Sequence, residues 1–191
     1  MMPQRALYGV SIVLSFTAWG IVTARYFWPA LRNLPRARAL RPILVLHGFR
    51  FIGLAFLVPG VVSPDLPIAF AHPAAYGDLN ATLLALLSPG TLQSSLGILL
   101  VWVFNFLGTA DLLYAFHQGN LTGIGDAPGQ MGAAYFIWTI LVPVLLITHG
   151  LAFRLLLNVR VRESVRRNRP ERVFYGRTIQ ALALAHVGWR G

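Results

Sequence analysis

Long apolar runs dominate the chain and predict membrane-spanning helices. Four of them, residues 6–28, 42–62, 92–117 and 131–157, consist mostly of hydrophobic residues. A helix of about 20 residues crosses a hydrocarbon core roughly 30 Å thick, so each run is long enough to span a bilayer. The pattern therefore predicts an all-α, polytopic helical bundle.

A fifth segment, residues 66–87, is apolar but contains two prolines together with His72, Asp78 and Asn80. The distribution of Arg decides how to interpret it. No Arg or Lys occurs from Phe51 to Phe153, whereas sixteen lie on either side of that stretch. Cationic residues collect in cytoplasmic loops, so both Arg-rich parts of the chain should face the cytoplasm.

Two segments on the same side of a membrane are separated by an even number of crossings. The runs at 42–62, 92–117 and 131–157 supply only three, and residues 66–87 supply the fourth. We therefore predict five spans, with the N-terminus outside and the C-terminus cytoplasmic. The alternative is four spans, with residues 66–87 entering and leaving on the same side.

Three prolines carry local predictions. Pro29 should end the first helix, and Pro42 should occupy the first turn of the second, where its missing N–H is tolerated. Pro143 should bend the last helix and release a backbone carbonyl that another group must satisfy.

Composition fits this interpretation and excludes several chemistries. Hydrophobic residues make up 56% of the chain and charged residues 12%. There is no Cys or Lys, which excludes disulfides, thiolate sites and Schiff-base lysines. The net charge of +10 comes from Arg side chains that we expect to face cytoplasmic water and anionic lipid headgroups, and no nucleic-acid partner is predicted. The Arg residues expected to contact headgroups are Arg36, Arg38, Arg166, Arg167 and Arg169.

The domain prediction follows from the same pattern. Residues 1–157 form one transmembrane domain, and residues 158–191 form a basic cytoplasmic tail with a short interfacial helix near its end. The predicted location is the inner, cytoplasmic membrane, with multiple passes.

Polar residues within the predicted spans fall at one depth. A rise of 1.5 Å per residue places His47 roughly 8 Å from the cytoplasmic end of its helix, Arg50 and His149 roughly 12 Å, Asp78 about 14 Å and Asn105 about 19 Å. Ionisable groups inside a membrane are expensive and usually face the bundle interior. The sequence therefore predicts a polar site formed by Arg50, Asp78, Asn105 and His149.

Arg50 and Asp78 are the sharpest pair in this layer. Pairing them across two helices removes most of the cost of burying each charge. One interpretation is an ion pair that fixes helix register, because polar contacts often specify packing in membranes. The other is a proton or substrate site.

His47 and His149 allow a cofactor hypothesis. Each precedes a glycine, which should leave room beside the imidazole, and each lies near an Arg. Two histidines on separate helices can ligate a b-type haem, with arginines pairing its propionates. Two His fall short of a closed zinc site, so no metal site is predicted.

Asp111 belongs to a second group in this interpretation. Asn105, Gly108 and Asp111 share one face of a helix, since they recur every three residues. We expect Gly108 to allow close helix contact and Asp111 to reach water at the outer surface, near His72 and His117.

Several motifs together resemble those of a group of uncharacterised bacterial integral membrane proteins. They are Phe49–Arg50, the LPxxFAxPA run from Leu66 followed by Gly77–Asp78, Asp111–Leu112, and FIxTxxVP from Phe136 followed by His149. The resemblance covers about residues 50–154 and implies a membrane fold without an established activity. Here Trp138 stands where that group usually has Pro, and His47 lies outside the shared pattern.

Three functions are open at this point. The first is a non-enzymatic accessory or self-assembling helical subunit, in a larger membrane complex or a homo-oligomer. The second is a haem or quinone-linked redox subunit, and the third is a carrier of protons or small solutes. No catalytic triad, phosphate-binding loop or metal box occurs in the sequence, so the interpretation leans away from an enzyme.

Overall fold

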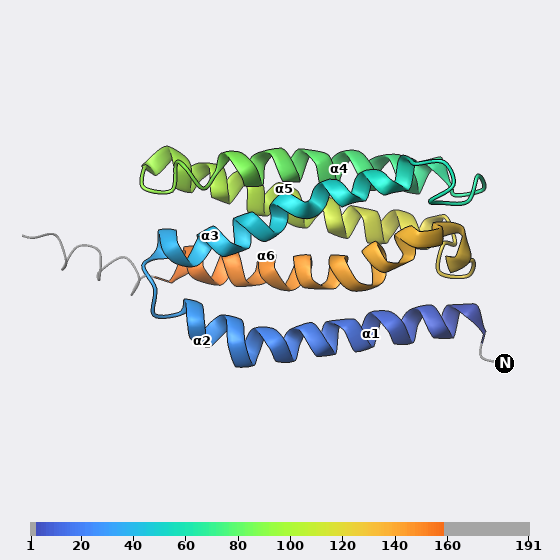
Figure 1. Cartoon of the computed structure of the whole chain (residues 1–191), viewed down its shortest axis with the longest axis horizontal. Helices are drawn as coiled ribbons and strands as arrows, with labels where there is room; N and C mark the ends of the chain where they lie inside the picture. The colour runs from blue at the N-terminus through green and yellow to red at the C-terminus, as the bar shows by residue number, and fades with distance from the viewer. Residues whose placement is uncertain (1–2, 159–191) are drawn as a thin grey trace, which may run out of the picture.

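The computed structural model describes residues 3–158, in which helices joined by turns and loops make up the regular structure and no β-strand occurs. It contains six α-helices, two 3-10 segments and two π-helical turns. Several of these follow one another without interruption, which produces five long rods lying side by side (Figure 1).

The first two rods are composite. α1 (Gln4–Val22), η1 (Thr23–Phe27) and α2 (Trp28–Leu31) form one rod. α3 (Arg36–His47) and η2 (Gly48–Leu57) form the next.

The remaining rods are α4 (Ile68–Leu87), α5 (Ser95–Leu121) and a last one made of η4 (Ile137–Leu141) and α6 (Val142–Leu157). The short η3 (Pro128–Ala134) precedes η4. The helix predicted over residues 66–87 is confirmed as a helix. Four rods are long and apolar enough to cross a membrane, and α4 is the one that falls outside that group.

Successive rods alternate in direction, so chain ends and turns sort to the two ends of the bundle (Figure 1). The turn before α3, the turn between α4 and α5 and the end of α6 lie at one end. Here the Arg154 guanidinium lies 3.8 Å from the centre of the Trp28 ring. The first Arg-rich segment and the start of the second therefore meet at the same end of the molecule.

Two proline predictions are wrong in detail. The first rod continues past Pro29 to Leu31, and Pro42 lies inside α3 because that helix begins six residues earlier, at Arg36. Proline removes a backbone donor and crowds the preceding turn. At Pro29 and again at Pro143, a five-residue π turn ends two residues before the proline. The wider turn accommodates the proline ring and the missing backbone hydrogen bond.

The 3-10 segment η2 is unusually long, at ten residues. Because a 3-10 helix has three residues per turn, side chains three apart lie in line. His47, Arg50, Gly53 and Phe56 are all buried and follow that spacing. In an α-helix each step of three residues would shift the side chain by about 60°, so the four would spread over half of the circumference.

The core consists of two apolar clusters with polar residues between them along the rods. One cluster contains Phe56, Phe70, Met131, Trp138 and Leu145. The other contains Leu40, Leu44, Phe104, Leu151 and Leu155. On η2, α5 and α6, the residues between the two clusters include Arg50, Asn105 and His149, all fully or almost fully buried.

α1 contributes only partly buried side chains to this core, among them Tyr8 and Ile12. It has no buried residue and packs beside α6 at the edge of the bundle (Figure 1). Its polar links include a bond from the Trp138 indole Nε1 to the Tyr8 hydroxyl and one of 2.9 Å from the Tyr135 hydroxyl to Ser11. An exposed ion pair of 3.3 Å joins Arg5 to Asp126.

Candidate functional site

Arg50 is the centre of the polar layer, and its side chain is completely buried. Its Nε donates to Asp78 Oδ1 at 2.7 Å, and its second terminal nitrogen donates to Asp111 Oδ2 at 2.6 Å. The remaining nitrogen donates to the Gly108 carbonyl at 3.3 Å and contacts His149 Nε2 at 3.2 Å. All three guanidinium nitrogens are therefore engaged, by groups from α4, α5 and α6. We call Arg50, Asp78, Asn105, Asp111 and His149 the Arg50 cluster.

The bonds around His149 determine which ring nitrogen carries the proton. Arg can only donate, so His149 Nε2 accepts from Arg50. His149 Nδ1 then donates to Asn105 Oδ1 at 2.7 Å, while Asn105 Nδ2 donates to the His149 carbonyl at 3.3 Å. A neutral His149 with the proton on Nδ1 satisfies every bond, and α5 and α6 are fastened to each other at this point.

His47 lies beside the cluster and makes a different contact. Its Nε2 is 3.0 Å from the Thr148 hydroxyl, which itself donates to backbone carbonyls one turn earlier, the nearer being Val144 at 2.8 Å. The hydroxyl has one proton, so it accepts from His47 Nε2. His47 Nδ1 is then a buried acceptor without a partner among residues 3–158.

Three glycines make the space that the cluster occupies. A Cβ on Gly53 would lie 2.0 Å from Asp78 Oδ2, and one on Gly77 would lie 1.6 Å from Asp111 Oδ1. A Cβ on Gly108 would meet the His149 ring at 2.6 Å and Arg50 at 2.9 Å. Gly108 therefore leaves room for polar side chains, and it is this glycine, in place of Gly150, that frees space beside His149.

The structure brings together the four residues that the sequence placed in one polar site. Arg50 contacts Asp78 and His149 directly, and Asn105 joins through His149. Their estimated depths had differed by several ångströms, but the contacts place them in one connected network.

The interpretation of Asp111 was wrong. Its carboxylate pairs with Arg50 and does not belong to an outer-surface group. His72 is exposed and its ring contacts Tyr76, and His117 is also exposed. The signal for Asp111 was the face that it shares with Asn105 and Gly108, which already faced the interior.

The two histidines do not fit a haem iron held between them. Their ring centres are 4.2 Å apart, whereas metal–imidazole bonds of about 2 Å would hold two opposed rings roughly 6 Å apart. Both nitrogens of His149 are also engaged in protein hydrogen bonds. No group of three or more potential metal ligands occurs among residues 3–158. Haem ligation stays a prediction that an optical spectrum of the purified protein would test.

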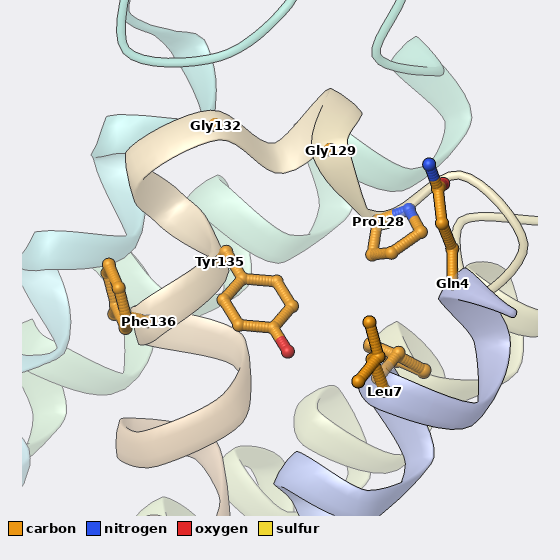
Figure 2. Close-up of a pocket in the computed structure, with 8 residues that line it drawn as sticks. Gln4, Leu7, Pro128, Gly129, Gly132, Tyr135 and Phe136 are labelled. Atoms are coloured by element: carbon orange, nitrogen blue, oxygen red, sulfur yellow. The ribbon is translucent and has the colours of Figure 1, made fainter. Parts of the chain in front are cut away.

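A cavity of about 310 Å³ lies elsewhere, between the start of α1 and the η3–η4 region (Figure 2). The Tyr135 side chain points toward α1 across it, in line with its bond to Ser11. Its lining comprises Gln4, Leu7, Tyr8, Pro128, Gly129, Gly132, Tyr135 and Phe136. None of these belongs to the Arg50 cluster.

The Arg residues expected at lipid headgroups fall into two groups. Arg38 is exposed and Arg36 is half-buried, both in the first turn of α3. Arg166, Arg167 and Arg169, with the predicted tail and its interfacial helix, lie outside the described residues.

Comparison with known proteins places the chain in one family. Residues 7–157 match a family described as a domain of unknown function (DUF8737). The chain belongs to that family. The match ends at the last residue of α6 and includes every member of the Arg50 cluster. No protein with a curated description matches the chain, and no solved structure matches it.

Proposed function

We propose that this chain is a five-span protein of the inner membrane, with its N-terminus outside. In this proposal it is a non-enzymatic helical subunit that self-assembles or joins a larger membrane complex. The Arg50 cluster holds the helices of this subunit together, and the anionic lipids of the cytoplasmic leaflet contact the Arg-rich end of the bundle.

The observation that carries this proposal is the complete burial and pairing of Arg50. A guanidinium inside a membrane is expensive unless its hydrogen bonds are satisfied. Here each of its nitrogens has a partner, and the partners come from three other helices. Such an arrangement supports a structural role, because polar contacts in membranes fix which helices pack and in which register.

Five spans are supported by the direction of the rods. α4 is helical over twenty residues and antiparallel to its neighbours (Figure 1), and its Asp78 has a charged partner in Arg50. The contact of Arg154 with Trp28 brings the two Arg-rich segments to one end. Exposed apolar side chains on every rod are consistent with lipid around the bundle.

Labelling of single cysteines in intact cells tests the span count. The chain has no Cys, so each label reports one position. We expect Gln93→Cys, in the turn between α4 and α5, to be protected from a membrane-impermeant maleimide, as Asn33→Cys should be. Asp65→Cys, at the other end, should react. If Gln93→Cys reacted as Asp65→Cys does, four spans would be correct and the fifth would be refuted.

One observation favours a second candidate, a proton carrier. The Asp111 side chain is 17% exposed, compared with 6% for Asp78 and 0% for Arg50. Two carboxylates face the Arg50 guanidinium, and the Asp111 carboxylate is the one that is partly exposed at the surface of the bundle. Proton flux into vesicles containing the purified protein, abolished by Asp111→Asn, would favour the carrier over the structural subunit.

A further inference from the structure

The outward face of α4 carries a polar side chain where a lipid-facing helix should be apolar. Asn80 is exposed, and its amide has no hydrogen-bond partner among residues 3–158. It lies seven residues before the end of α4, which is about 10 Å along the axis, with about 18 Å of helix on its other side. If α4 spans a bilayer, Asn80 lies within the hydrocarbon layer.

An amide facing hydrocarbon loses its bonds to water and gains none in return. Asn is also too short to reach the headgroups as a long Lys or Arg side chain does. Neither lipid tails nor the neighbouring rods satisfy it, so the missing partner should come from another chain.

The residues around Asn80 form a continuous strip. Ala69, His72, Tyr76, Asn80, Leu83 and Leu87 are all exposed. Eighteen residues separate the first from the last, which is five turns at 3.6 residues per turn, so they share one face. The opposite side of α4 packs against η2 and α5.

We propose that this strip, the α4 outward face, binds a second copy of the chain and that Asn80 hydrogen-bonds to Asn80 of that copy. The inference rests on the proposed membrane-spanning role. Copies inserted in the same orientation are related by a two-fold axis along the membrane normal. Equivalent residues then meet at equal depth, so Asn80 lies opposite itself.

An amide is suited to such self-pairing because it has both donors and an acceptor. Each Asn80 can donate to the other across the axis and accept in return. Leu83 and Leu87 lie on the same face toward one end, and they would pack against their equivalents. A membrane interface of this kind needs close packing and interhelical hydrogen bonds, and the strip offers apolar side chains for the first and the Asn80 amide for the second.

Oxidative cross-linking in native membranes tests the interface, because the wild-type chain has no Cys. With copper–phenanthroline as oxidant, we expect Leu83→Cys and Leu87→Cys to give a disulfide-linked product of twice the chain mass. Val13→Cys is the matched control, since Val13 is at least as exposed as Leu83 but lies on α1. Cross-linking of Leu83→Cys no greater than that of the control would overturn the proposal. A product of any other mass would identify a different occupant and would also overturn it.

The role of Asn80 is tested in the Leu83→Cys background. Asn80→Leu should reduce dimer formation roughly 3- to 30-fold, as measured by dilution of the protein in lipid vesicles. Asn80→Gln, which keeps the amide, should retain part of it. Unchanged dimer formation in Asn80→Leu would refute the amide pairing.

Alkaline washing of the same membranes separates the two proposals. A chain that stays in the membrane pellet but does not cross-link refutes only the α4 interface. A chain that is washed out of the membrane refutes the five-span proposal, and the interface is refuted with it.

Discussion

At the scale of single residues, the cluster explains why position 50 is Arg. Arg50 reaches two carboxylates, a carbonyl and an imidazole at once, through three nitrogens held in a rigid plane. A lysine ammonium is a point charge and cannot reach groups spread around the edge of such a plane.

Substitution of Arg50 tests this reasoning. Arg50→Met should lower the free energy of unfolding by about 3–5 kcal/mol, because it leaves buried carboxylates without a partner. Arg50→Lys should lower the free energy of unfolding by less, since the positive charge is kept while the several hydrogen bonds of the planar guanidinium are lost. Tryptophan fluorescence during denaturation in detergent measures both changes. Arg38→Met, at an exposed position, should change stability by no more than about 0.5 kcal/mol. Equal stability of Arg50→Met and Arg38→Met would contradict the role assigned to the cluster.

The glycines of the cluster provide an independent prediction. Gly77→Ala and Gly53→Ala place a methyl group within 2.0 Å of a carboxylate oxygen, so the carboxylate or the backbone beside it must shift and the bond to Arg50 is disturbed. We expect each to cost about 1–3 kcal/mol. Gly20→Ala is the control, because nothing lies within 4 Å of its Cβ position and a helical glycine gains stability on becoming Ala. Thermal unfolding midpoints should therefore fall for the first two and stay level or rise for Gly20→Ala.

At the scale of the elements, the sequence predicted correctly which segments form helices but predicted several helix ends wrongly. The apolar runs predicted four of the rods. The distribution of Arg predicted α4, whose hydropathy alone is too low to indicate a membrane span. The ends near Pro29 and Pro42 were wrong because helix propensity treats proline as a terminator. Packing of the long rod and a π turn override that tendency at Pro29.

The 3-10 character of η2 had no recognised signal in the sequence. The sequence of residues 47–57 predicts an ordinary apolar α-helix. The three-residue spacing of the buried positions in it can be recognised only once the partners of Arg50 are known. Asp111 was missed for a related reason. Its distance along α5 suggested outer water, whereas the reach of the guanidinium brings it into the cluster.

Packing differs sharply between α1 and α6, and this leads to a prediction about the elements. Leu14 is 62% exposed on α1, whereas Leu155 is fully buried on α6. Leu155→Ala should cost about 2–5 kcal/mol, because it opens a cavity that its neighbours only partly fill. Leu14→Ala should cost much less, since most of the Leu14 side chain faces lipid or detergent. Urea or heat denaturation of the two variants in the same detergent measures the difference, and similar losses would mean that α1 is packed more tightly than its burial indicates.

At the scale of the whole molecule, the arrangement is two apolar clusters with a polar network between them. The sequence predicted the layer because four helices placed polar groups at similar depths. It could not predict the bonds, because hydrogen-bond partners depend on how rods turn about their axes. The sequence also could not predict which side chains the three glycines admit. That depends on η2 facing Asp78, α4 facing Asp111 and α5 facing His149 in the packed bundle.

The backbone of η2 also sets how far the second rod reaches. A 3-10 helix rises about 2.0 Å per residue, compared with 1.5 Å in an α-helix, so its ten residues extend about 20 Å in place of about 15 Å. The rod from Arg36 to Leu57 has 22 residues and extends about 38 Å, while the 27 residues of α5 extend about 40 Å. The 3-10 geometry of η2 thus brings a rod of 22 residues close to the length of the 27-residue α5.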